Sequence, residues 1–309
     1  MQKKGFEFSF TWMFVLIVGA AILFLAVFMA SRLITREGTT YNTEVAAELG
    51  AALTPIETSV EDEKYAPIQF PSETRVINEC DAEGTFGEQA LAVTVRSGVG
   101  KEWAKTGIPY RSSYSFIFSP DSFQARQAHV IASSVSLPFR VGNAVVLYAD
   151  RYCFVNPPED IEDALVQLGA EGMTVVPSRG ACAEESISVC FSTNGCDIRV
   201  DADSVHRGVV HKGTDSLPFV DGLFYAALVA EPELYECQLM RIRKRTSEVA
   251  RLYAEKSAFL DARGCSSHMA SDLITYRANL LNEHSSLDAL SAEAEVLQRI
   301  NDRLACALF

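Results

Sequence analysis

The chain is short of positive charge. Its 309 residues include 27 Lys and Arg against 40 Asp and Glu, which gives a formal net charge of −13. Proteins bind nucleic acid through a basic face that neutralises phosphates, so we expect no nucleic-acid partner. Hydrophobic residues make up 48% of the chain, enough to build a sizeable core. The composition therefore indicates a folded protein with a solvated acidic surface.

Several catalytic and metal-binding motifs are missing. Cys182, Cys190 and Cys196 are separated by seven and five residues, wider than the spacing of structural zinc ligands. No nucleophile elbow of the form Gly-x-Ser-x-Gly occurs. Residues 98–101, Gly-Val-Gly-Lys, lack the spacing of a phosphate-binding loop, and Glu102 follows the lysine. We therefore expect no catalytic residue, metal site or cofactor, and a protein that is not an enzyme.

Two groups of polar residues have side chains that could form a binding site. Asp201, Asp203, His206 and His211 have the side chains of a divalent-metal site, but matches this loose are common by chance, so we interpret them as a solvated loop. The basic run at 241–245 lies in an expected helix, where such side chains spread around the axis. We expect it to be a solvated face, with an anionic partner or a lipid head group as the alternative.

One long apolar run lies near the N-terminus. No charged residue occurs from Phe8 to Ser31, a stretch of 24 residues. As a helix it would be about 36 Å long, enough to cross about 30 Å of hydrocarbon. A cleaved secretory signal would have a shorter apolar region ending in small residues, whereas bulky Phe28 lies near the end here. We predict that residues 1–36 are an uncleaved membrane anchor, with the lipid bilayer as a partner.

The charges beside this run and the cysteines after it predict its orientation. Lys3 and Lys4 precede the run and Arg32 and Arg36 follow it, so the positive-inside rule only weakly favours a cytoplasmic N-terminus. The even number of cysteines beyond it suits disulfides in an oxidising compartment, with buried free thiols as the alternative for some. The disulfide candidates are Cys80, Cys153, Cys182, Cys190, Cys196, Cys237, Cys265 and Cys306. We predict a single-pass protein of the cell membrane whose bulk is extracytoplasmic.

Residues 37–64 are expected to form an amphipathic helix and a linker. Val45, Leu49 and Leu53 recur at helical spacing. The sequence Gly-Thr-Thr at 38–40 interrupts the connection to the anchor, and we expect a hinge there. The polar run at 61–64 has the composition of a linker.

Residues 65–230 have the pattern of an α+β domain made mainly of short strands. The segments are rich in β-branched and aromatic residues and are bounded by turn residues. The candidate strands are Thr74–Cys80, Ala90–Arg96, Ser113–Phe118, His129–Val135, Ala144–Tyr148, Met173–Val176, Ser186–Phe191, Asp197–Val200 and Leu223–Val229.

Two local features of this ectodomain are more specific. A helix is expected after Pro158, with Asn156 as its cap, Ile161 and Leu165 in its apolar stripe, and Gly169 at its end. The Asn-Gly pair at 194–195 is a turn signal, so we expect a hairpin over residues 189–200. Cys190 and Cys196 would then face each other across that hairpin.

Residues 231–309 are expected to form a helical hairpin or a three-helix unit. Apolar residues repeat at steps of four and three up to Leu260, and Gly264 ends that helix. Ser285 and Asp288 resemble a capping box, which predicts a turn and a third helix. An antiparallel return over that turn would bring Cys306 back to Cys265, and one continuous helix would instead favour pairing of Cys306 with Cys237.

Two resemblances to known families add to these predictions. The start of the chain, Lys-Lys-Gly-Phe at 3–6 before an apolar helix, resembles a type IV pilin leader, which implies possible processing between Gly5 and Phe6 and packing of the helix in a filament. Phe10 stands where that family usually has a glutamate.

The second resemblance spans the whole chain. Residues 152–158, 235–237 and 264–265, with a cysteine just before the C-terminus, are similar to a family of uncharacterised archaeal single-pass membrane proteins. That resemblance implies an archaeal cell surface and no particular activity. We therefore expect a structural or interaction protein of the cell envelope, with an unidentified envelope protein as partner in a larger assembly. A pilin-like filament subunit is the first alternative, and an extracytoplasmic enzyme is the second.

Overall fold

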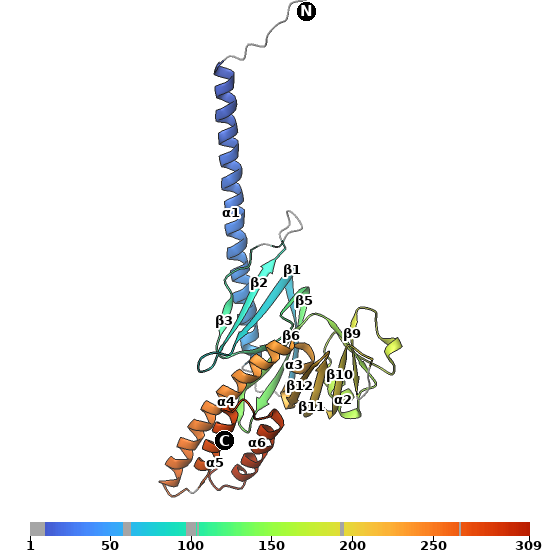
Figure 1. Ribbon diagram of the computed structural model, residues 1–309, viewed down its shortest axis with the longest axis vertical. Helices are drawn as coiled ribbons and strands as arrows, with labels where there is room; N and C mark the ends of the chain where they lie inside the picture. Colours follow the sequence, from blue (N-terminus) through green and yellow to red (C-terminus); the bar gives the residue numbers. More distant parts are fainter. Residues whose placement is uncertain (1–9, 58–62, 97–102, 104, 192–194, 266) are drawn as a thin grey trace, which may run out of the picture.

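In the computed structural model, one long helix rises from a body of two sheets and a group of C-terminal helices (Figure 1). The structure describes all residues except 1–9, 58–62, 97–102, 104, 192–194 and 266. The long helix is α1 (Phe10–Glu57). Its segment Trp12–Met29 has a mean hydropathy of 2.7 and is long and apolar enough to cross a membrane. None of this segment is buried against the rest of the described chain.

The C-terminal half of α1 packs onto the body. The helix is continuous through Gly38, so the hinge predicted at 38–40 is wrong. Val45, Leu49 and Leu53 are buried against the first sheet, which confirms the amphipathic helix. The apolar segment and part of the core thus belong to one helix of 48 residues.

The first sheet is built from six strands that are consecutive in the chain. They lie in the order β3-β2-β1-β5-β6-β4, antiparallel except for the pair β4 and β6. The long strand β1 pairs with β5 on both sides of a bulge between Gln69 and Thr74. Glu63 and Lys64 belong to β1 and not to a linker. The strands are β1 (Glu63–Asp81), β2 (Glu88–Val95), β3 (Tyr110–Ser112), β4 (Phe116–Phe118), β5 (Ser122–Ser136) and β6 (Arg140–Tyr148).

The second sheet uses the next six strands, in the order β12-β11-β10-β9-β7-β8. Strands β8, β7, β9 and β10 are parallel, and β10, β11 and β12 are antiparallel. Ile198 pairs with Val189 in a parallel ladder, so the predicted 189–200 hairpin is wrong. The strands are β7 (Arg151–Val155), β8 (Met173–Val176), β9 (Ser186–Phe191), β10 (Ile198–Ser204), β11 (Arg207–Lys212) and β12 (Asp215–Val220).

Two helices occur within this part of the chain. Helix α2 (Glu159–Leu168) buries Ile161 and Leu165 and ends at left-handed Gly169, as predicted. Its N-cap residue is Pro158, whereas the sequence predicted Asn156. Helix α3 (Phe224–Val229) is completely buried and follows the short turns η1 (Arg179–Ala181) and η2 (Asp221–Leu223) in the chain. The strand predicted at Leu223–Val229 is therefore wrong.

Three helices complete the chain, as the sequence predicted. They are α4 (Pro232–Asp261), α5 (Ala270–Leu281) and α6 (Leu287–Asn301). Ser286 accepts a hydrogen bond from the Ala289 N–H and caps α6. The first half of α4 lies against the first sheet, and its second half extends away to pack with α5, which in turn packs with α6 (Figure 1). The C-terminal helices and both sheets share one hydrophobic core, so the unit beginning near 231 is not packed separately.

Candidate functional site

A cleft of about 780 Å³ lies where the start of β1, helix α2 and the end of β10 meet. Three carboxylates line it, together with a phenol, a hydroxyl and an imidazole. These side chains are Glu63, Asp160, Asp163, Tyr65, Ser204 and His206. The negative lining favours cationic groups over anionic ones.

Tyr65, in the lining of this cleft, forms an aromatic pair with His129, which is buried behind it. The Tyr65 hydroxyl is hydrogen bonded to His129 Nδ1 at 2.8 Å, and the His129 ring lies 5.1 Å from that of Tyr148. Burial lowers the pKa of His129 and raises that of Tyr65, because both charged forms lose contact with water. Both groups are therefore uncharged at neutral pH, and the pair contributes packing and one hydrogen bond to the wall.

Ser204, His206 and Asp221 are the residue types of a nucleophile, a base and an orienting carboxylate. His206 Nδ1 lies 3.0 Å from an Asp221 oxygen. The Ser204 hydroxyl accepts instead from the backbone N–H of His206, at 3.3 Å. The His206 side chain is 75% exposed. An activated nucleophile needs a hydrogen bond to the ring of its base, so this geometry does not form a catalytic triad.

Of the polar residues predicted to lie in a loop, Asp201, Asp203 and His211 lie on strands β10 and β11, and His206 lies in the turn between them. Asp201 bonds His211 Nε2 at 2.9 Å across the β10–β11 ladder and also pairs with Arg199. His206 lies at the other end of that ladder with Asp221. No group of three or more potential metal ligands occurs in the part of the chain that the structure describes.

All eight cysteines are joined in four disulfides. The structure joins Cys190 to Cys196 and Cys265 to Cys306, with Cα–Cα distances of 5.7 and 6.3 Å. Both pairings match the sequence analysis, although the first closes a parallel crossover where a hairpin was expected.

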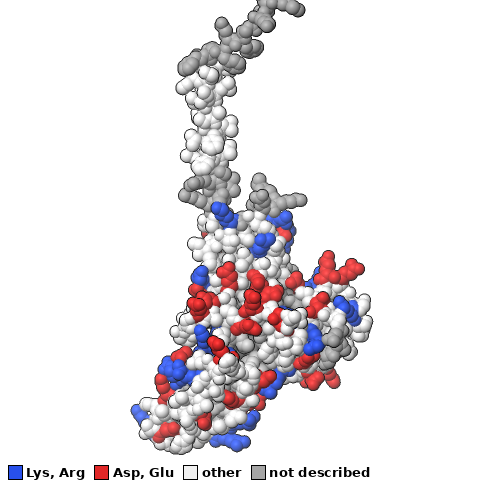
Figure 2. Space-filling view, in the orientation of Figure 1, with Lys and Arg blue, Asp and Glu red and all other residues white. Residues whose placement is uncertain are grey.

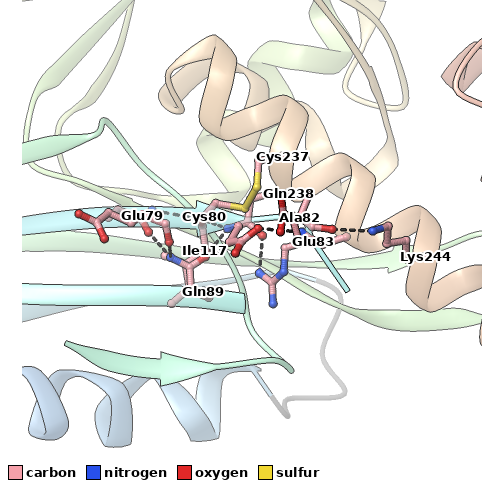
Figure 3. Close-up of a disulfide and its surroundings, with 12 residues drawn as sticks. Glu79, Cys80, Ala82, Glu83, Gln89, Ile117, Cys237, Gln238 and Lys244 are labelled. Carbon is pink, nitrogen blue, oxygen red and sulfur yellow. Dashed lines mark hydrogen bonds between the residues drawn. A yellow bond between two sulfur atoms is a disulfide. The ribbon is translucent and has the colours of Figure 1, made fainter. Parts of the chain in front are cut away.

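The other two disulfides join residues whose pairing the sequence did not predict. Cys153 in β7 bonds Cys182, 29 residues later. Cys80 in β1 bonds Cys237 in α4, 157 residues away, and ties the first sheet to the helical unit (Figure 3).

Beside this last disulfide lies a buried network of amides. Gln238 of α4 donates to Gln89 of β2, Gln89 donates to Asn78 of β1, and Asn78 donates to the Ser119 hydroxyl at 2.8 Å. Gln238 also donates to the Ile117 carbonyl at 3.0 Å (Figure 3). Each buried amide therefore has a partner, and the chain of hydrogen bonds fixes how α4 sits on the sheet.

The basic run on α4 is not the solvated face that the sequence suggested. Arg241 is fully buried and donates to the carbonyls of Ser115, Ser112 and Phe86 and to Gln238. Lys244 donates to the carbonyl of Ala82 at 2.5 Å. Burial lowers the pKa of Arg241 to about 10, so the group stays charged at neutral pH.

Through these contacts Arg241 attaches helix α4 to the first sheet. The sequence signal that could have shown this is the heptad pattern of α4. Arg241 precedes buried Ile242, and it follows Gln238, also buried, by one helical turn.

Gly5 and Phe6, the processing position predicted from the pilin resemblance, lie outside the described residues. No known protein family, curated protein or solved structure matches the chain in the comparisons made with it.

Proposed function

We propose that this chain is a membrane-anchored structural or interaction protein of the cell envelope, with its body outside the cytoplasm and a protein partner in a larger assembly. The observation that carries the proposal is the continuous helix α1. Its apolar segment Trp12–Met29 is unburied, and its later turns are buried in the body. A domain held in this way cannot swing freely on a loose tether, so the anchor also sets its orientation.

The cysteines support an oxidising compartment. Every cysteine is in a disulfide, and two of the bridges span 157 and 41 residues of the chain. Disulfides of this kind persist outside the reducing cytosol. The acidic cleft has no activated nucleophile among its described residues, which supports a binding role over a catalytic one.

The topology can be tested with a membrane-impermeant protease applied to intact cells. We expect digestion of the body and survival of a short fragment containing α1. A cytoplasmic fusion protein expressed in the same cells should remain intact and serves as the control. Full protection of the body in sealed cells, with digestion only after lysis, would contradict the proposal.

A pilin-like filament subunit is the second candidate. It is supported by the same exposed apolar helix, which in a filament would pack against copies of itself instead of lipid. N-terminal sequencing of protein from native membranes distinguishes the two. A mature chain starting at Phe6 favours the filament subunit, and an intact N-terminus favours the simple anchor.

A further inference from the structure

The end of the body nearest the apolar segment is basic, although the chain as a whole is acidic. Asn42 is where α1 enters the body: its side chain accepts from the Val95 N–H at 3.1 Å and donates to the Lys105 carbonyl at 2.8 Å. Val95 and Lys105 therefore mark the level of the body closest to Trp12–Met29. Figure 2 shows Lys and Arg side chains gathered on the end from which α1 rises, and acidic side chains over the middle of the body.

Among the residues that the structure describes at this end, four basic residues and one tryptophan form a group that we call the basic collar. Arg96 follows Val95, and its N–H donates to the Glu73 carbonyl. The Arg75 guanidinium lies 4.4 Å from the centre of the Trp103 ring, and that of Arg96 lies 5.9 Å away. Arg126 stands in β5 opposite the bulge that contains Glu73. The collar consists of Arg75, Arg96, Trp103, Lys105 and Arg126.

Charge at the collar is only partly balanced by its neighbours. Glu73 forms an ion pair with Arg96 at 2.6 Å. Lys105 and Arg126 are exposed. A tryptophan among basic side chains suits the interface between water and lipid headgroups, where indole rings and cations are both enriched.

The length of α1 brings the collar close to a membrane. The thirteen positions from Met29 to Asn42 add about 20 Å of helix. Headgroups occupy about 5–8 Å of that height. An upright helix would therefore leave the collar roughly 12–15 Å above them, and a common tilt of about 20° lowers one side further. An upright helix would thus hold the collar beyond one Debye length of about 8–10 Å, where its attraction to anionic headgroups is largely screened, so the attraction acts on the side that the tilt brings closer.

We propose that the basic collar docks on anionic lipid headgroups and holds the body tilted against the membrane surface. The proposal rests on the membrane anchorage proposed above. Each Lys or Arg held at an anionic surface contributes about a fivefold change in the docking equilibrium. Loss of Lys105 and Arg126 should then lower the ratio of docked to undocked protein about 25-fold.

The chain offers a direct probe, because it contains two tryptophans and one of them is in the collar. Trp12→Phe leaves Trp103 as the sole tryptophan of the full chain. This variant would be placed in lipid nanodiscs that carry a nitroxide quencher on their headgroups. One set is made of phosphatidylcholine, and a second has a third of its lipid replaced by phosphatidylglycerol.

We expect stronger quenching of Trp103 in the anionic discs, and loss of the difference at high salt. Lys105→Gln with Arg126→Gln should abolish the difference, whereas Arg263→Gln with Arg303→Gln, both exposed on the C-terminal helical unit, should not. Equal quenching in both sets of discs would overturn the docking proposal and leave the anchor standing. If the full chain does not co-purify with discs at all, the anchor fails, and docking fails with it.

Discussion

Cys80 and Cys237 lie 157 residues apart in the chain and 6.1 Å apart at their Cα atoms. Cys80 lies next to the end of the long strand β1, and Cys237 lies in the first turns of α4. Their bond closes one covalent loop that runs from the end of β1 through the rest of both sheets to the start of α4. Because the entropy removed from the unfolded chain grows with loop length, this bridge should stabilise the fold more than any short-range one.

The first prediction compares this bridge with the one that joins Cys265 to Cys306, which spans 41 residues. Cys80→Ser with Cys237→Ser should lower the free energy of unfolding by about 1 kcal/mol more than Cys265→Ser with Cys306→Ser. Guanidinium unfolding of the detergent-solubilised full chain, followed by near-ultraviolet circular dichroism, measures both losses. A larger loss for the short loop would show that local strain or packing, and not chain entropy, dominates.

The second prediction concerns Arg241. Arg241→Met removes the donor of three carbonyls, of which that of Ser115 is buried, and of the buried Gln238 side chain. We expect a loss of about 3 kcal/mol or more in the free energy of unfolding. Lysine should not rescue it, because a single ammonium cannot reproduce the planar fork.

Arg251→Met is the matched control on the same helix. Arg251 is 43% exposed and pairs with Glu248 and Glu255 at the surface. Such exposed pairs contribute little to stability, because water and salt screen them. Equal losses for the two variants would mean that the buried network around Gln238 does not depend on Arg241.

Much of the fold follows from the sequence, because its strongest signals are local. The apolar segment, helix α2 with its glycine end, and the three C-terminal helices each depend on periodicity and caps within one element. The run Leu223–Val229 could not be assigned in the same way. It is buried on every side, so it has no polar face to distinguish a helix from a strand.

Other misses depend on contacts between distant elements. The Asn-Gly pair at 194–195 predicted a hairpin, but β10 pairs parallel to β9. Helical spacing places Arg241 next to buried positions of α4, but it does not identify the carbonyls of Ser112, Ser115 and Phe86 that accept its hydrogen bonds. Likewise, the acidic cleft is assembled from β1, α2 and β10, and no local motif announces it.

The third prediction is a pH dependence that arises from His129. Burial lowers its folded-state pKa below the ordinary 6.5, so the unfolded chain binds more protons as pH falls through that value. The contribution of His129 is thus fully present above pH 6.5 and declines as the pH falls toward the folded pKa. The charged and titratable groups near it are Tyr65, Tyr148 and Glu171.

His129→Gln should flatten the stability curve in this range, because glutamine does not titrate. His284→Gln, at an exposed position after α5, should leave the curve unchanged. Chemical unfolding midpoints between pH 5 and 7.5 would show the difference. If stability still falls with pH in His129→Gln as it does in the wild type, the proton uptake belongs to another group.

The last prediction separates the two roles of α1. Deleting residues 1–36 removes Trp12–Met29 but keeps the turns that pack on the first sheet, so the product should be soluble and folded. Deleting residues 1–57 also removes Val45, Ala46, Leu49 and Leu53, which are at most 7% exposed. Loss of these side chains uncovers the apolar face formed by β2, β5 and β6. Burying a large aliphatic side chain is worth about 1.5–3 kcal/mol, so the second deletion should cost about 4–9 kcal/mol, comparable to the whole stability of a typical domain. It should therefore aggregate or bind a hydrophobic dye, whereas the first should unfold cooperatively on heating. Equal solubility and equal melting temperatures for the two would show that the later turns of α1 are dispensable, and that the body folds without the helix that positions it.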